Sequence, residues 1–219
     1  MELRLEALTW QDARERIEQD TEIAVFPIGS MEQHGYHGPL GTDSIIADAI
    51  TKDVAKRLNA LSLPPLWYGV SSHHMNFSGT ITVRPETISH IIEDILDSLI
   101  HHGVKKILLL NGHGGNTPSI RIACGKVRER HPEVFLAHSS VWLALHDDYD
   151  ELPDEARQMD WRSLAAHAGC LETSLTMAID KTMVKLERAV DKPVDRFAQA
   201  GDPTLSVIAK VEELTEVGS

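Results

Sequence analysis

The sequence predicts an α/β fold, because strongly apolar segments alternate with stretches of helical periodicity. Two segments, EIAVFPI (Glu22 to Ile28) and KKILLL (Lys105 to Leu110), have the continuous apolar character of strands that are buried on both faces of a sheet. Each is followed by a polar loop and then by a helical pattern. In sheets built from such units, ligands bind at the carboxyl ends of the strands, so the two loops are the candidate functional segments.

The other elements follow from the same periodicities, taken in chain order. Residues 1–20 are expected to form a short strand and then a helix from about Thr9. A helix is predicted from Thr42 or Asp43, because Ile46, Ile50, Val54 and Leu58 recur every four residues. Further along we expect a short strand at Ala60 to Leu66, a strand at Thr80 to Val83, a helix from Pro85 to His102 ended by Gly103, a helix from Thr117-Pro118, a strand at Val134 to Trp142, and a helix ending near Ile179.

Composition excludes several classes of protein. A chain of 219 residues with 42% apolar content can bury one domain core. No apolar run is long enough for a membrane span and the first residues are no signal peptide, so we expect a cytoplasmic protein that does not bind membranes. The net charge of −12 argues against nucleic acid as a partner. Cys124 and Cys170 give no disulfide framework and are expected to be small core residues.

The loop PIGSMEQHGYHGPLGTD, from Pro27 to Asp43, concentrates metal-binding side chains. It contains Glu32, His34, His37 and Asp43. Carboxylates and imidazoles bind Zn²⁺, Mn²⁺ and Fe²⁺, and the two oxygens of one Asp can bridge two ions. The alternative interpretation is an acidic helix cap with solvated histidines.

The second loop, NGHGGN (Asn111 to Asn116), has two interpretations. A Gly-rich loop between a strand and a helix can cradle phosphate with its backbone N–H groups, although this one lacks the Lys-Ser/Thr of a P-loop. Alternatively, His113 is a metal ligand on a tight turn. We favour the ligand, and both interpretations hold together if the substrate carries a phosphate.

Two further segments carry candidate side chains. In the polar loop SSHHMN, Ser72 and His74 are candidate substrate contacts, with His74 preferred to His73. His167 and Glu172 lie five residues apart in HAGCLETS. Both can face one cavity only if His167 lies at the entrance of the predicted helix rather than within it.

Together these segments resemble the creatininase (creatinine amidohydrolase) family. The resemblance rests on Gly29 to His34 with Gly41 to Asp43, on Asn111 to Asn116, on His167 to Ser174, and on His74 to Thr80, and it spans roughly residues 23–180. It implies one domain over residues 1–219, a three-layer α/β/α sandwich with a mostly parallel sheet, and homo-oligomers. It also implies two divalent metal ions (Fe²⁺, Zn²⁺ or Mn²⁺) that serve hydrolysis of non-peptide C–N bonds.

The same resemblance assigns roles to residues. Glu32 and His113 would hold one metal, His34 the second, and Asp43 would bridge them. His167 matches the catalytic histidine, which at near-neutral pH can protonate the leaving amine. Creatininase has a glutamate for the second metal where this chain has Gly115. Either Glu172 supplies that carboxylate or the second site is weaker and filled by solvent.

The short length and the segments HGYHGPLGTD and HHMNFSGT most resemble an archaeal deformylase subfamily. The predicted reaction is therefore deformylation of 2-amino-5-formylamino-6-ribosylaminopyrimidin-4(3H)-one 5'-monophosphate, which releases formate in riboflavin and coenzyme F420 biosynthesis. For this small-molecule substrate, Asn111 and Asn116 are candidate phosphate or pyrimidine contacts. The alternatives are a creatininase-like amidohydrolase or mycofactocin-type peptidase with another small amide or peptide substrate, and a metal- or phosphate-binding module without catalysis.

Overall fold

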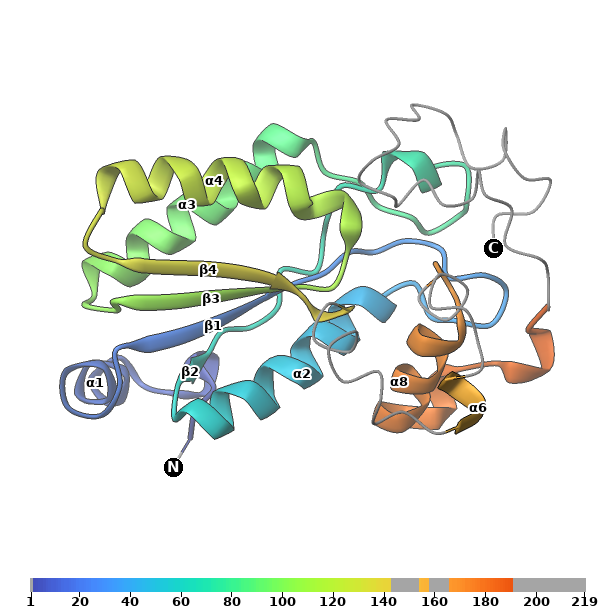
Figure 1. Cartoon of the computed structure of the whole chain (residues 1–219), viewed down its shortest axis with the longest axis horizontal. Coiled ribbons are helices and arrows are strands. Elements are labelled where there is room, and N and C mark those ends of the chain that lie inside the picture. The colour runs from blue at the N-terminus through green and yellow to red at the C-terminus, as the bar shows by residue number, and fades with distance from the viewer. Residues whose placement is uncertain (1, 143–153, 158–165, 191–219) are drawn as a thin grey trace.

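A parallel four-stranded sheet with helices on both faces forms the body of the protein in the computed structural model, which describes residues 2–142, 154–157 and 166–190 (Figure 1). The strands are β1 (Ile23–Ile28), β2 (Leu61–Ser62), β3 (Lys106–Asn111) and β4 (Phe135–Ser140), in the order β2-β1-β3-β4. The central strands β1 and β3 pair from Ile23 opposite Lys106 to Ile28 opposite Asn111. They therefore end side by side, and the two candidate loops leave the same edge of the sheet.

The long helices form the outer layers. Helices α3 (Pro85–His101) and α4 (Thr117–Arg130) pack together over one face, and α2 (Thr42–Leu58) covers the other face with α8 (Cys170–Asp180) beside it (Figure 1). This confirms the predicted three-layer α/β/α sandwich with a mostly parallel sheet. The short helical segments are η1 (Leu5–Ala7), α1 (Trp10–Glu15), η2 (Arg16–Asp20), η3 (Ser72–His74), η4 (Gly114–Asn116), α6 (Asp154–Arg157), η6 (Lys181–Met183) and η7 (Leu186–Arg188).

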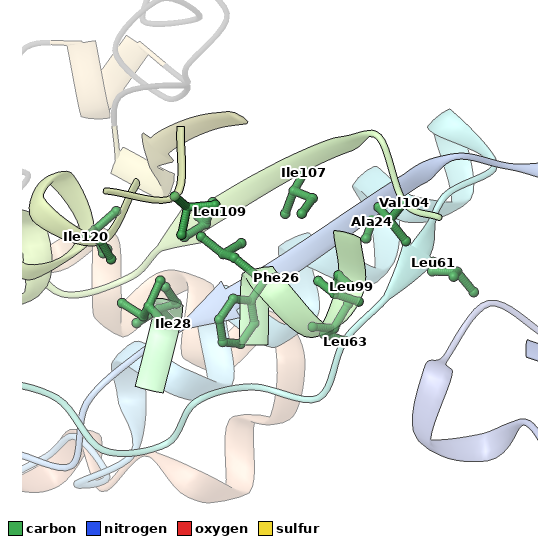
Figure 2. Close-up of a cluster of buried hydrophobic side chains, with 14 of the residues drawn as sticks. Ala24, Phe26, Ile28, Leu61, Leu63, Leu99, Val104, Ile107, Leu109 and Ile120 are labelled. Atoms are coloured by element: carbon green, nitrogen blue, oxygen red, sulfur yellow. The ribbon is translucent and has the colours of Figure 1, made fainter. Parts of the chain in front are cut away.

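Alternation along the strands divides the core into two clusters. Ala24, Phe26 and Ile28 of β1 point toward α3 and α4, where they pack with Ile107 and Leu109 of β3 (Figure 2). Val25 points to the opposite face and packs with residues of α2. Both faces of β1 are thus buried, which explains its continuous apolar sequence.

Capping residues, prolines and a glycine mark the helix ends that the sequence predicted. Thr9 and Asp12 form a capping box at the start of α1. Pro85 and Pro118 occupy the first turns of α3 and α4. Gly103, with φ +102°, follows the end of α3 in a backbone conformation that other residues rarely adopt.

Several predictions of elements and burial are wrong or too long. Residues 80–83 form isolated bridges, Met31 with Ile81 and Gly69 with Thr82, because their neighbours are loops rather than strands. The N-terminal strand is likewise a single bridge, and β2 has two residues instead of seven. Leu58, in the last turn of α2, is 47% exposed, and Cys170 is exposed at the first residue of α8.

Two predictions about the whole chain extend beyond the part that is described. The single domain over residues 1–219 includes segments outside the described ranges and stays a prediction. Among the described residues, no helix is both long and apolar enough to cross a bilayer.

Candidate metal centre

The loop after β1 folds back on itself and brings two carboxylate side chains and one imidazole together. Backbone hydrogen bonds from Glu32 N to Leu40 O (2.9 Å) and from Gly38 N to His34 O (3.0 Å) close the loop. Asp43 lies in the first turn of α2, directly after it. Glu32, His34 and Asp43 are each at most 2% exposed.

A first pocket, which we define by Glu32, His113 and Asp43, lies between the ends of β1 and β3. His113 Nδ1 is 3.2 Å from Glu32 Oε1 and 3.1 Å from Asp43 Oδ2. The other ring nitrogen, Nε2, donates to the Val70 carbonyl oxygen at 2.9 Å. This bond fixes the ring so that Nδ1 faces the two carboxylates, as outer partners of metal-binding histidines do.

A second pocket, defined by His34, Asp43 and Glu172, uses the other oxygen of Asp43. His34 Nε2 is 3.1 Å from Asp43 Oδ1 and 3.6 Å from Glu172 Oε2, while His34 Nδ1 donates to the Glu32 carbonyl oxygen. Glu172 Oε2 accepts a hydrogen bond from Ala168 N at 2.6 Å. Ala168 adopts φ +54°, so this turn places its amide at the carboxylate despite a backbone conformation unfavourable for alanine.

The imidazole-to-carboxylate separations in the two pockets suit divalent cations. Ligands bonded at about 2.0–2.2 Å in tetrahedral or octahedral arrangements lie about 3.0–3.5 Å apart, close to the separations found here. Asp43 Oδ2 is buried, and its one close polar neighbour among the described residues is His113 Nδ1, 3.1 Å away, which does not complete a well-formed hydrogen bond. His34, Asp43 and Glu172 also have three ligand atoms within 4.8 Å of one another, as do Glu32, His34 and His167, and Glu32, His73 and His113.

The electrostatics of the pockets favour positive charge. Burial alone would lower the pKa of His34, but the carboxylates of Asp43 and Glu172 raise it to about 10. Burial would also lower the pKa of His113, but the carboxylates of Glu32 and Asp43 outweigh burial. They raise the pKa of His113 well above its usual value. Burial raises the pKa of Glu172 to about 7. The protonated rings of His34 and His113 balance the buried carboxylates, and a divalent ion that displaced these protons would supply positive charge at the same place.

His167 lies at the entrance of α8, as its spacing from Glu172 required. Its Nε2 is 2.8 Å from the Gln33 carbonyl oxygen, and its Nδ1 is 3.7 Å from Glu32 Oε1. The buried His74 stacks on His167 with ring centroids 4.5 Å apart. Burial and the neighbouring His34 lower the pKa of His167 to about 4. The ring is therefore neutral at pH 7, whereas the sequence-based expectation was a group that titrates near neutrality.

The three other predicted substrate contacts, Ser72, Asn111 and Asn116, have the following surroundings, and their role as substrate contacts stays a prediction. Asn116 donates to Gly29 O and accepts from Val70 N, and Asn111 accepts from His113 N and donates to Thr117 Oγ1. Both amides thus hold the scaffold together. Ser72 is exposed at the start of η3.

Sequence reasoning missed two buried polar residues beside the pockets. Ser71, next to Ser72, donates to Glu32 Oε2 at 2.5 Å. Gln33 contacts both His74 and His167. Gln33 could have been found from its position between the candidate ligands Glu32 and His34. The sequence does not tell which of the adjacent Ser71 and Ser72 faces the site, because that depends on the backbone of the loop.

Gly115 cannot carry a side chain in this loop. A Cβ there would lie 2.3 Å from Val70 O and 2.4 Å from His113 Nε2. A glutamate at this position would displace the ring of His113. The carboxylate near the second pocket belongs instead to Glu172 on α8.

Comparisons with known proteins agree with this arrangement. The family model for creatininase, creatinine amidohydrolase, matches residues 6–219. The chain is 30% identical over 203 residues to creatinine amidohydrolase of Pseudomonas putida, across 87% of this chain and 76% of that protein. A solved structure described as creatininase with Mn superposes with a TM-score of 0.81 at 28% identity and covers 88% of this chain and 79% of its own.

Other relatives have different activities. A 3-dehydro-scyllo-inosose hydrolase of Thermotoga maritima is 27% identical over 90% of this chain, and a mycofactocin precursor peptide peptidase of Mycobacterium ulcerans is 31% identical over 75%. The chain spans only 62% and 61% of their lengths. The formylaminopyrimidine ribotide deformylase of Methanococcus maripaludis is 31% identical over 101 residues, 44% of this chain and 43% of that protein.

The matched residues, the fold and the ligand cluster therefore lead to the same family. Solved creatininases described with Mn and as the Zn-Zn type, together with the carboxylate and histidine cluster of this chain, support binding of divalent metal. The chain belongs to the creatininase family of metal-dependent amidohydrolases.

Proposed function

We propose that the protein hydrolyses an amide C–N bond of a small molecule at a centre of two divalent ions. The observation that carries the proposal is the orientation of Asp43, whose two oxygens face the ring nitrogens of two different histidines, His34 and His113, each 3.1 Å away. Each histidine also faces a second carboxylate, Glu172 for His34 and Glu32 for His113.

The donor set assigns the ligands of each ion. Glu32 and His113 would hold the first ion, His34 and Glu172 would hold the second, and Asp43 would serve both. A mixture of carboxylate and imidazole ligands suits Fe²⁺, Zn²⁺ or Mn²⁺. Ser71 donates to Glu32 Oε2, which leaves Oε1 directed into the first pocket.

The reaction needs a proton carrier beside the ions. Divalent ions at such a centre lower the pKa of water and polarise an amide carbonyl. His167 presents Nδ1 toward Glu32, so it can take a proton there and later deliver it to the leaving amine. Its Nε2 lies 2.8 Å from the Gln33 carbonyl oxygen, a contact that helps to keep the ring in this orientation.

The substrate within the amide class has two candidates. The formylaminopyrimidine ribotide follows from the family resemblance, supported by a partial match to the deformylase. A cyclic amide such as creatinine is favoured by the longer match to creatinine amidohydrolase. Asn111 and Asn116, the predicted phosphate or pyrimidine contacts, are hydrogen-bonded to Thr117 Oγ1 and Gly29 O, which weighs against the ribotide.

The test is metal-dependent hydrolysis by the whole protein. Protein purified without oxygen is reconstituted with Fe²⁺, Mn²⁺ or Zn²⁺, and formate release from the ribotide is compared with ring opening of creatinine. His167→Ala should lower the rate by about 10²–10⁴-fold, whereas the exposed His90→Ala should not. Folded, metal-loaded protein that binds such amides without hydrolysing them would contradict the proposal. Light scattering on the same samples tests the predicted homo-oligomer.

A further inference from the structure

Gln33 is a buried residue that has no assigned role in the proposed reaction. It lies in the chain between Glu32 and His34 and is 5% exposed. Its Nε2 is 3.0 Å from His74 Nδ1 and 2.9 Å from His167 Nε2. One carboxamide therefore connects the two stacked histidines of the site.

The orientation of this carboxamide follows from its other contact. Gly35 N, which can only donate, lies 2.8 Å from Gln33 Oε1. The oxygen therefore faces Gly35, and the NH₂ group faces the histidines with one hydrogen for each. His74 must then accept at Nδ1 and carry its own proton at Nε2.

His167 Nε2 meets two groups of opposite character, both from Gln33. The backbone carbonyl oxygen, 2.8 Å away, accepts when Nε2 carries a proton. The side-chain NH₂, 2.9 Å away, donates when Nε2 carries none. Only one of these bonds exists at a time, because a neutral imidazole nitrogen is either a donor or an acceptor.

We propose that Gln33 is a positioning residue for His167, which it keeps hydrogen-bonded at Nε2 in either neutral tautomer while Nδ1 faces the metal ligand Glu32. Each tautomer gains one hydrogen bond at Nε2, to the carbonyl oxygen or from the side-chain NH₂ of Gln33. This inference rests on the proposed role of His167 in the reaction.

Gln33 also sets the plane of the ring. Its bond to His74 holds that buried side chain against the face of His167, with an angle of 20° between the rings. His34 also packs against His167, with the ring centroids 4.6 Å apart. Loss of the carboxamide therefore removes one of the contacts that fix where Nδ1 points.

The test compares Gln33→Leu and Gln33→Glu with the exposed Gln11→Leu as control. Leucine removes the carboxamide, and glutamate keeps the acceptor for Gly35 but replaces the NH₂ donor. In Zn²⁺-loaded protein, ¹⁵N NMR of the His167 ring measures the tautomers directly. Both variants should move His167 to the form protonated at Nε2, because only acceptors remain there, and Gln11→Leu should match the wild type.

Kinetics on the active protein supply a second readout. Both Gln33 variants should lower kcat by about three- to ten-fold, the equivalent of one hydrogen bond, with less than about a two-fold change in KM and an unchanged metal content. Wild-type tautomer populations in both variants, or loss of metal, would overturn the inference. If no substrate is hydrolysed, the proposed function fails, but the NMR comparison still decides whether Gln33 controls the tautomer.

Discussion

The two faces of the sheet differ in composition: one carries most of the apolar core, and the other carries candidate metal ligands. Among the described residues, fifteen buried apolar side chains form the cluster under α3 and α4, and six form the cluster under α2. The α2 side carries Asp43 and, on α8, Glu172, both of them buried carboxylates. Charged groups are costly to bury, so the face that holds the ligands has the smaller apolar core, and the opposite face supplies most of the hydrophobic stabilisation.

This division predicts that substitutions on the two faces have separable effects. A change on the α3 and α4 side should alter the free energy of unfolding and leave metal stoichiometry alone. A change among the ligands of α2 and α8 should lower metal stoichiometry, and its effect on the free energy of unfolding should come mainly from the lost metal.

The largest effect is expected for Asp43→Asn. Asparagine offers one oxygen instead of two, so it cannot bridge the two pockets. The affinity for both ions should fall by more than about 100-fold, since even outer partners of metal ligands are worth about 10–100-fold. Elemental analysis of protein loaded with metal and then desalted measures this loss. Asp53→Asn, exposed on the same helix, is the control, and retention of both ions by Asp43→Asn would remove Asp43 as the bridge.

Ile92→Ala should have the largest effect on stability. Ile92 is fully buried in the cluster under α3. Its truncation leaves a cavity and should cost about 2–5 kcal/mol of the free energy of unfolding, measured by urea denaturation. Metal stoichiometry should stay at the wild-type value. Ile122→Ala, at a position 55% exposed on α4, should cost little, and metal loss in Ile92→Ala would show that the two faces are coupled.

Glu172→Gln tests whether the two pockets bind their ions separately. Glu172 serves only the second pocket, whereas Glu32 serves the first. We expect Glu172→Gln to bind one ion with wild-type affinity and the other about 10–100-fold more weakly. Isothermal titration with Zn²⁺ separates the two events. Ser174→Ala on the exposed side of α8 is the control, and weakening of both ions equally would contradict two distinct pockets.

The parts of the fold predicted from the sequence are those with local causes. The strands β1 and β3 follow from continuous apolar runs, and α3 from its proline and glycine boundaries. The strand expected at residues 80–83 depends on partners distant in the chain, and these are loops. The length of β2 depends on distant partners in the same way.

The candidate site shows the same limit at the level of single side chains. Glu32, His34, Asp43 and His113 were recognisable because metal chemistry demands their types. Whether Asn111 and Asn116 face a ligand or the scaffold is decided by which backbone groups lie opposite them, which composition does not reveal. The position of Glu172 beside His34 likewise depends on how α8 docks on α2.

The smallest effect concerns a carboxylate on the stabilising face. Glu93 of α3 accepts hydrogen bonds from Lys126 Nζ (2.9 Å) and Ser89 Oγ (3.2 Å), and Arg130 lies 3.5 Å away. Burial alone would raise the pKa of Glu93, but these partners hold it below the ordinary value of 4.5. A carboxyl whose pKa is lower in the folded than in the unfolded protein stabilises the fold above about pH 4.5 and loses that contribution as the pH falls through its folded pKa.

Glu93→Gln should therefore lower the free energy of unfolding by about 1 kcal/mol at pH 7, and the difference from wild type should shrink below pH 4.5. Urea denaturation from pH 7 to pH 3.5 measures it, with the exposed Asp94→Asn as control. Metal stoichiometry at pH 7 should not change. A difference that is constant over this range would mean that packing of the side chain, rather than its charge, connects α3 to α4. In either case Glu93 on this face serves the fold, whereas Asp43 of α2 and Glu172 of α8 face a histidine.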